Sequence, residues 1–256
     1  MQIIACIKSV IMVPPTEDMV RSQGLCELNP YDRPVLETAL RLRDAHGGRV
    51  IALSMGPDAA RFGLQEALAM GVDQGILVCD PALAGSDTLA TSTALAAAIR
   101  RLAPFDLVLF GTRTADSDTG QVGPQTAVLL GVPVVCQVHT ITHQAGEIRV
   151  ERTADGFVEI FEISLPAALT VQSGAVESRD IRLSGIEEAF VEDRLALWRL
   201  RDLDLSPERV GSPGSATRVI SMTRAHQGRM CEFLEGEAEE KAEALITRLS
   251  EKGMIG

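Results

Sequence analysis

The hydrophobic pattern along this chain alternates between two kinds of segment. Short, almost continuous apolar runs predict buried parallel strands at residues 2–10, 49–54, 75–79 and 106–110. Between these runs, apolar residues recur at three- and four-residue spacing, which predicts helices at residues 32–46, 58–70 and 87–102. A strand followed by a helix, repeated along the chain, is typical of a parallel sheet covered on both faces. We therefore expect an α/β fold built on a Rossmann-like parallel sheet.

The pattern changes after residue 131. Residues 132–142, 147–153 and 157–164 alternate or run apolar at strand length, and Asp155-Gly156 supplies a tight turn between the last two. These segments predict an antiparallel meander added to the sheet.

The C-terminal part of the chain is charged from about residue 184 and ends in a Glu-rich helical pattern at residues 235–252. We interpret residues 1–185 as one α/β domain and residues 186–256 as an extended C-terminal arm. Such an arm has no core of its own, so we expect it to dock on a partner, with a solvated tail as the alternative. The apolar side chains expected to be buried there include Val210, Val219, Ile220 and Phe233.

Composition narrows the class of protein. With 256 residues, of which 46% are hydrophobic, the chain can bury a large core. Its longest apolar stretches are far shorter than the roughly 20 residues of a membrane-spanning helix, so we expect no membrane insertion. A net charge of −11, without a basic stripe, argues against nucleic acid as a partner. The five cysteines are scattered and residues 1–10 read as a strand and not as a secretory leader, so we expect a cytoplasmic protein.

Glycine and hydroxyl residues gather after the fourth predicted strand. In open parallel sheets, ligands bind beyond the carboxyl ends of the strands, which here lead into residues 9–15, 55–57, 80–88 and 111–124. The last segment runs into a helix that ends near Leu130. Its backbone amides and the helix N-terminus predict a phosphate or pyrophosphate site. A glycine-rich crossover that binds nothing is the alternative.

Other site motifs are not matched. Residues 111–124 lack the Lys-Ser/Thr ending of a Walker loop, and no GxGxxG follows the first strand, which argues against classical ATPases and dehydrogenases. Asp116-x-Asp118-x-Gly120 begins like a calcium loop, but glycine and glutamate are missing at the required later positions.

Histidine, serine and cysteine spacing likewise predicts no chemistry. His139 and His143 lie on a predicted strand, where a spacing of four does not bring two side chains together as it does in a helix. No Ser/His/Asp or Cys/His set has a recognisable local signature. We therefore predict neither a metal site nor a catalytic residue.

Taken in order, the segments that follow the strands resemble the beta subunit of electron-transfer flavoproteins, and the resemblance covers essentially the whole chain. The matching segments are Cys6-Ile-Lys8, Leu28-Asn-Pro-Tyr-Asp32, Ser54-Met-Gly-Pro57, Glu66-Ala-Leu-Ala-Met-Gly-Val-Asp73, Gly85-Ser-Asp-Thr-Leu-Ala-Thr91 and residues 111–124. Residues 150–159 and 165–170 match a hairpin signature of the family, except at Phe157 and Phe161.

The resemblance implies a heterodimer in which residues 1–185 hold a nucleotide and a larger alpha subunit holds the electron-shuttling FAD. In many members the beta-subunit nucleotide is AMP, bound by a loop with an asparagine, a threonine and a final glutamine, which Gly120, Val122 and Pro124 replace here. The loop resembles instead the branch that carries a second FAD in this subunit and accepts hydride from NADH. We therefore expect FAD, with AMP as the alternative.

The residues that the resemblance assigns to the cofactor lie on several of these loops. They are Cys6, Asn29, Met55, Gly56, Thr88, Thr91, Gly111, Thr112, Asp116, Asp118, Thr119, Gly120, Gln121 and Val122.

Residues 176–186 resemble the segment whose leucine, here Leu183, inserts into a dehydrogenase partner of the acyl-CoA dehydrogenase type. An acidic stretch follows it where the family commonly has lysines. The function implied is electron transfer through FAD, between that dehydrogenase or NADH and an acceptor. Two other functions compete with it: a non-redox adenine-nucleotide-binding module of the stress-protein type, which leaves the meander and the arm unexplained, and a nucleotide-dependent ligase or hydrolase, which lacks a catalytic set.

Overall fold

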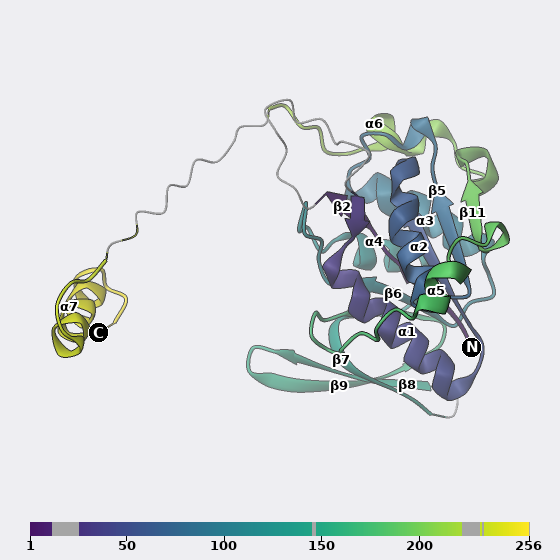
Figure 1. Cartoon of the computed structure of the whole chain (residues 1–256). Helices are drawn as coiled ribbons and strands as arrows, with labels where there is room; N and C mark the ends of the chain where they lie inside the picture. Colours follow the sequence, from purple (N-terminus) through teal and green to yellow (C-terminus); the bar gives the residue numbers. More distant parts are fainter. Residues whose placement is uncertain (12–25, 145–146, 222–230, 232, 256) are drawn as a thin grey trace. The chain divides into compact units, whose positions relative to one another are not determined.

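The structure is a computed structural model that describes residues 1–11, 26–144, 147–221, 231 and 233–255 (Figure 1). The chain divides into two compact units, Met1–Arg218 and Val219–Gly256. Of the loop expected at residues 9–15, residues 12–15 lie outside the described part. No helix among the described residues has the length and apolar character needed to cross a membrane.

One mixed sheet organises the described part of the first unit. Its nine strands follow the order β11-β5-β4-β1-β6-β10-β7-β8-β9. The strands from β11 to β7 run parallel, whereas β8 and β9 are antiparallel additions. Their bounds are β1 (Gln2–Cys6), β4 (Arg49–Met55), β5 (Gln74–Val78), β6 (Leu107–Gly111), β7 (Val134–Gln144), β8 (Glu147–Ala154), β9 (Phe157–Ser164), β10 (Ala167–Val171) and β11 (Leu195–Trp198). The α/β class and the meander are thus confirmed.

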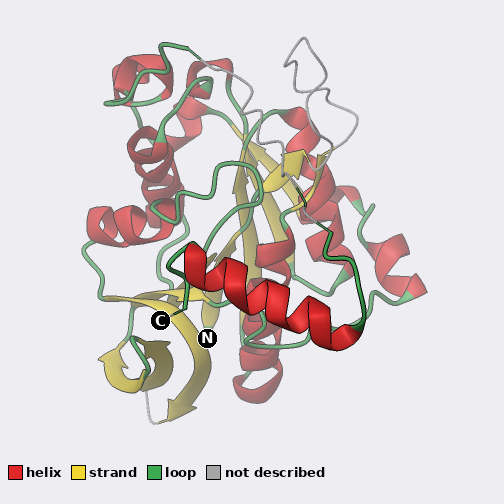
Figure 2. Cartoon of the chain, turned by 90° about the vertical axis from the view of Figure 1, so that its left-hand side faces the viewer, coloured by secondary structure: helices red, strands yellow, loops and turns green. Residues whose placement is uncertain are grey.

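Helices cover both faces of this sheet (Figure 2). The longer ones in the first unit are α1 (Arg33–His46), α2 (Arg61–Ala69), α3 (Thr88–Arg101) and α4 (Val122–Leu130). Shorter ones are α5 (Leu183–Glu188), α6 (Gly211–Gly214) and the 3-10 turns η2 (Pro30–Asp32), η3 (Asp58–Ala60), η4 (Pro81–Leu83), η5 (Glu192–Arg194), η6 (Leu200–Leu203) and η7 (Pro207–Arg209). The periodicity predicted α1, α2 and α3 to within a few residues, because each buries one apolar stripe, and α4 ends at Leu130, where the helix after residues 111–124 was expected to end.

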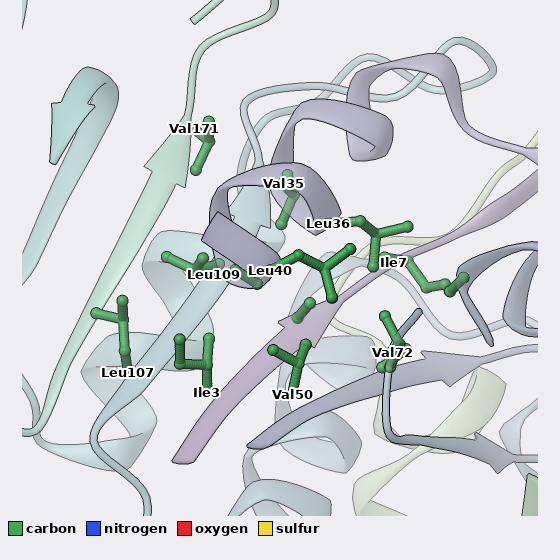
Figure 3. Packing of buried hydrophobic residues seen from close by; sticks show 14 of the residues in the cluster. Ile3, Ile7, Val35, Leu36, Leu40, Val50, Val72, Leu107, Leu109 and Val171 are labelled. Atoms are coloured by element: carbon green, nitrogen blue, oxygen red, sulfur yellow. The ribbon is translucent and has the colours of Figure 1, made fainter. Parts of the chain in front are cut away.

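Alternation along each central strand creates two cores. Ile3 and Ala5 of β1 pack with α1 and α2, whereas Ile4 and Cys6 of the same strand pack with α3 and α4. Figure 3 shows the first core, in which Val35 and Leu40 of α1 lie over the parallel strands. Both faces are apolar because both are covered, which explains the nearly continuous apolar runs in the sequence.

Three features differ from the pattern-based expectation. The first strand ends at Cys6, and residues 9–11 form a separate strand, β2 (Ser9–Ile11), antiparallel to β3 (Cys26–Leu28). Strands β10 and β11 were not expected, because they lie outside the regular alternation of strand and helix patterns and their pairing depends on distant strands. The third difference is at the start of the helix expected at residues 58–70, where the residue type of Asp58 predicts an N-cap. Pro57 occupies the N-cap position instead, and Asp58 pairs with Arg61.

The first compact unit extends to Arg218, beyond the boundary expected at residue 185. The reason is β11, which pairs in parallel with β5 and brings the following segment onto the core. Val210, expected to be buried on a partner, is already fully buried in this chain. That expectation was wrong for Val210, because η7 and α6 return to pack beside α3 and η4.

The second unit contains α7 (Ala238–Glu251), close to the helix expected at residues 235–252. No residue of α7 is buried, and Val219, Ile220 and Phe233 are 76%, 97% and 88% exposed. Docking of this unit on a larger subunit stays a prediction.

Candidate functional site

The strand order creates a topological switch point beside β1, at the carboxyl ends of the parallel strands. The chain runs outward from β1 to β4 and β5, then returns to place β6 on the other side of β1. Ligands of open α/β sheets bind beyond the carboxyl ends of the strands at such a point. The segments that lie there follow β1 at Ile7, β4 at Gly56 and β6 at Thr112.

The segment after β6 is an exposed loop with two left-handed backbone positions. Residues 115–121 are exposed, and φ is 50° at Asp118 and 62° at Gly120. A Cβ on Gly120 would lie 3.0 Å from the carbonyl oxygen of Thr112. The loop therefore folds closely on itself and lies at the surface before α4 begins at Val122.

Two helix N-termini meet beside this loop. The Thr88 hydroxyl at the start of α3 lies 3.1 Å from Oε1 of Gln121, and the Ser92 hydroxyl donates to the carbonyl oxygen of Val122 at 3.2 Å. The first backbone N–H groups of a helix have no partner within it and carry its positive dipole end. The Asp87 carboxylate already caps α3, whereas no side chain caps α4, so the N–H groups that can attract a phosphate here are those at the start of α4.

The cations and carboxylates of the loop are already paired. Lys8 Nζ lies 2.6 Å from Oδ2 of Asp116, and Arg113 binds both carboxylate oxygens of Asp118. Burial acts to raise the pKa of Asp116, but hydrogen bonds and the charge of Lys8 bring it below its usual range. The Asp118 carboxylate raises the pKa of Arg113. Because these charges cancel, the backbone amides are the main positive groups left for an anion.

Two of the predicted cofactor residues, Cys6 and Asn29, have buried side chains. Cys6 is 6% exposed, and burial, followed by the charge of Asp32, raises the pKa of its thiol. A protonated buried thiol contributes packing and not reactivity. Asn29 is fully buried and directs its amide group to the loop after β6.

The other predicted residues lie in four places. The first is the segment 111–122, which contains Gly111, Thr112, Asp116, Asp118, Thr119, Gly120, Gln121 and Val122. The second is the first turn of α3, which contains Thr88 and Thr91, and Thr88 contacts Gln121 of that segment. The third is the carboxyl end of β4, where Met55 is the last residue of the strand and Gly56 follows it. Leu183, 76% exposed, begins α5, which packs on α2 away from this loop.

Sequence reasoning missed the contacts that hold these loops in place. Asp87 caps α3 through the N–H of Ala90 at 2.9 Å and accepts the N–H of Thr217 at the same distance, while the Ser215 hydroxyl accepts the N–H of Asp87. The cap itself was predictable from the residue type. The contact with residues 215–217 joins positions about half the chain apart, which no local pattern reveals.

The described residues include no group of three or more His, Cys, Asp or Glu side chains placed to hold a metal ion. His139 and His143 turn to different neighbours: His139 lies within hydrogen-bond distance of Thr140 and Thr153, and the His143 ring stands edge-on to His46 at 4.8 Å. As expected for a strand, the two imidazoles are not brought together.

Comparison with known proteins decides the family. The model of the electron transfer flavoprotein domain matches residues 19–192, which include the whole loop after β6. The chain belongs to the electron transfer flavoprotein family. It is 35% identical to the electron transfer flavoprotein subunit beta of Thermoanaerobacterium thermosaccharolyticum over 94% of this chain and 93% of that protein.

Two other relatives carry different names. The chain is 36% identical to the caffeyl-CoA reductase-Etf complex subunit CarD of Acetobacterium woodii over the full length of both, and 37% identical to protein FixA of Azotobacter vinelandii over 97% of this chain and 94% of that protein. Membership of this electron-transferring family decides against the non-redox stress-protein interpretation.

Proposed function

We infer that this chain is the beta-type subunit of an electron transfer flavoprotein that binds FAD at the loop after β6 and pairs with a larger alpha-type subunit. The observation that carries this proposal is the meeting of two helix N-termini beside a glycine-containing loop at the switch point of the sheet. The subunit names of full-length relatives support the pairing with another subunit.

The residues present fit a dinucleotide. Loop backbone amides and the first turn of α4 are available to a pyrophosphate, and the Thr88 and Thr91 hydroxyls are suited to hydrogen-bond a ring or ribitol oxygen. FAD supplies the reversible uptake of electrons when it is bound. The chain itself would bind and orient the cofactor, with the loop amides and the start of α4 holding its phosphates.

FAD is favoured over AMP because the loop lacks the polar pair of the AMP-binding members. Gly120 and Val122 offer no side-chain hydrogen bond to a phosphate, which lowers the affinity expected for a ligand held mainly by charge-assisted bonds. They also leave a slimmer loop, with room for a longer ligand toward α3.

The cofactor content of the purified heterodimer tests this proposal. Co-expression with the neighbouring large-subunit gene, acid extraction and chromatography should give two FAD per heterodimer and no AMP. One FAD and one AMP per heterodimer would defeat the FAD assignment. A complex without any nucleotide on this chain would defeat the site itself.

The electron donor forms a second part of the proposal. The proposed donors are NADH and a dehydrogenase of the acyl-CoA dehydrogenase type that contacts Leu183, whose side chain is exposed. We also propose that the protein is cytoplasmic, because its five cysteines form no disulfide among the described residues. Anaerobic bleaching of the flavin by NADH tests the first donor, and a Leu183→Ala variant with slower electron transfer from the dehydrogenase, but unchanged bleaching by NADH, tests the second.

A further inference from the structure

The short helix α5 packs on α2 through its small residues (Figure 1). Ala189, directly after α5, is 4% exposed, and a Cβ on Gly185 would clash with the carbonyl oxygen of Ala69 at the end of α2. Positions four residues apart lie on one face of a helix, so Gly185 and Ala189 form the face that contacts α2. The large side chains of this segment therefore have to lie on another face.

Three large apolar side chains of this segment share an exposed face. Leu183, Ile186 and Phe190 follow one another at spacings of three and four residues and are between 46% and 76% exposed. The N–H of Phe190 donates to the carbonyl oxygen of Glu187, so the helical turn continues past the end of α5. A surface helix normally turns such a stripe toward the core. An apolar stripe that faces outward indicates a contact with another protein.

Acidic residues flank this stripe. Exposed carboxylates are contributed by Asp180, Glu187, Glu188 and Asp193. The arginines described in the same segment are Arg182, which is exposed, and Arg194. Arg194 is engaged within the chain, because its Nη1 lies 3.3 Å from Oε2 of Glu188 and its guanidinium also donates to the carbonyl oxygens of Val72 and Asp73. The surface around the stripe is therefore acidic, as is the whole chain with its net charge of −11.

We propose that Leu183, Ile186 and Phe190 form one docking stripe for a redox partner that offers an apolar pocket edged with lysine or arginine. This rests on the proposed function, because it takes the partner to be the dehydrogenase proposed to contact Leu183; it adds two anchors and the sign of the partner's charge. Apolar side chains at the centre of a contact supply most of its affinity, and complementary charges around them speed the encounter. A partner with acidic edges is repelled by Glu187 and Asp193.

Steady-state kinetics of the assembled heterodimer test the stripe. The probe is the purified acyl-CoA dehydrogenase of the organism that makes this protein, and the heterodimer is its electron acceptor. Phe190→Ser should raise the KM for the heterodimer about tenfold and leave kcat unchanged, because it removes an anchor of docking. Glu187→Lys should raise this KM at low salt, and the difference from the wild type should shrink in about 0.5 M NaCl, because salt screens the charges.

Two matched variants at the other end of α2 serve as controls. Phe62→Ser removes another exposed phenylalanine, and Asp58→Lys reverses another exposed carboxylate. Both should leave the KM at its wild-type value, and all four variants should keep the FAD content and the elution volume of the wild-type heterodimer. A wild-type KM in Phe190→Ser, or equal effects of Glu187→Lys and Asp58→Lys, would refute the docking stripe.

Cross-linking in cells separates the stripe from the choice of donor. If the dehydrogenase does not reduce the wild-type heterodimer, that donor in the proposed function fails, and the photoreactive residue benzoylphenylalanine in place of Phe190 then decides the stripe. A cross-link to a flavin or iron–sulfur protein other than the larger subunit, through a surface segment rich in lysine or arginine, supports it. A cross-link through an acidic segment, to the larger subunit, to a second copy of this chain or to a protein without a redox cofactor overturns it, and so does the absence of any cross-link.

Discussion

Gly120 shows at the scale of one residue how the loop depends on backbone geometry. Its φ of 62° is a left-handed conformation, which costs an L side chain roughly 1–2 kcal/mol. We predict that Gly120→Glu abolishes nucleotide binding, because it adds bulk and negative charge where phosphates are expected. Gly131→Glu is the control for charge and left-handed backbone at the far end of α4: its φ is 74°, although a Cβ there would meet no atom within 4 Å, whereas one at Gly120 approaches the Thr112 carbonyl oxygen. Nucleotide content after gel filtration is the measurement, and equal content in both variants would contradict the site.

Asp32 gives a second prediction at this scale, for the pH dependence of stability. Burial raises its pKa from 3.8 to about 7, against the lowering effect of the Lys8 backbone bond, Asn29 and the Lys8 charge, with Asp116 acting to raise it. Cys6, the other titratable group beside it, has a raised pKa and stays neutral. The native state therefore keeps a proton that the unfolded state has released. Stability contributed by this group is greatest below pH ~4 and falls as the pH rises to about 7, by at most about 1.4 kcal/mol per pH unit.

The Asp32→Asn variant tests this sign. It cannot ionise, so its free energy of unfolding minus that of the wild type should increase between pH 5 and pH 7 and level off above. Urea unfolding at several pH values measures the difference. A difference that is flat or decreases over this range would show that Asp32 is ionised in the folded protein throughout.

At the scale of elements, the N-terminus of α3 depends on a residue shared with a distant segment. Asp87 accepts the N–H groups of Ala90 and Thr217, and although burial acts to raise its pKa, these bonds hold the pKa below its usual range. Asp87→Ala should destabilise the protein by about 1–2 kcal/mol through loss of the cap. It should also weaken nucleotide binding, because Thr88 follows directly. Asp58→Ala removes a surface pair with Arg61 that caps nothing, so it should change stability by less than about 0.5 kcal/mol. Chemical unfolding measures the free energy of unfolding of both variants, and equal decreases in the two would contradict the role of Asp87.

At the scale of the whole molecule, the two compact units differ in how much they bury. Met1–Arg218 contains both cores, whereas Val219, Ile220 and Phe233 in the second unit are largely exposed. We predict that the full chain expressed alone aggregates, and that residues 1–218 stay monodisperse and unfold cooperatively, because the exposed apolar side chains are then absent. Light scattering during gel filtration measures this.

A pair of variants sharpens that test. Ile220→Asp should reduce aggregation of the isolated full chain and weaken its association with the larger subunit, whereas Ser221→Asp adds the same charge at the adjacent exposed residue and should do neither. A full chain that is a monodisperse monomer without its partner would contradict the prediction that this unit binds a larger subunit.

The sequence by itself determined the central α/β architecture. Long periodic segments such as residues 32–46 and 87–102 can bury their apolar stripe in only one way, and the apolar runs at residues 49–54 and 106–110 need cover on both faces. The same reasoning located the loop after β6, because a glycine-rich segment between a buried strand and a helix has a known place at the edge of a parallel sheet. The order of the motifs along the sequence also indicated the family that the comparisons confirmed.

Only the tertiary structure decided which distant residues share a contact. β10 enters the sheet between β6 and β7, and β11 pairs with β5 and carries Val210 into the core, although neither strand has a pattern long enough to predict its neighbour. The Asn29 amide is bound to residues 113–115 and Asp87 to Thr217 because the fold brings those backbones within hydrogen-bond distance. Hydrophobic periodicity indicates which face of an element is buried, but it does not indicate which polar side chain hydrogen-bonds to which distant backbone group.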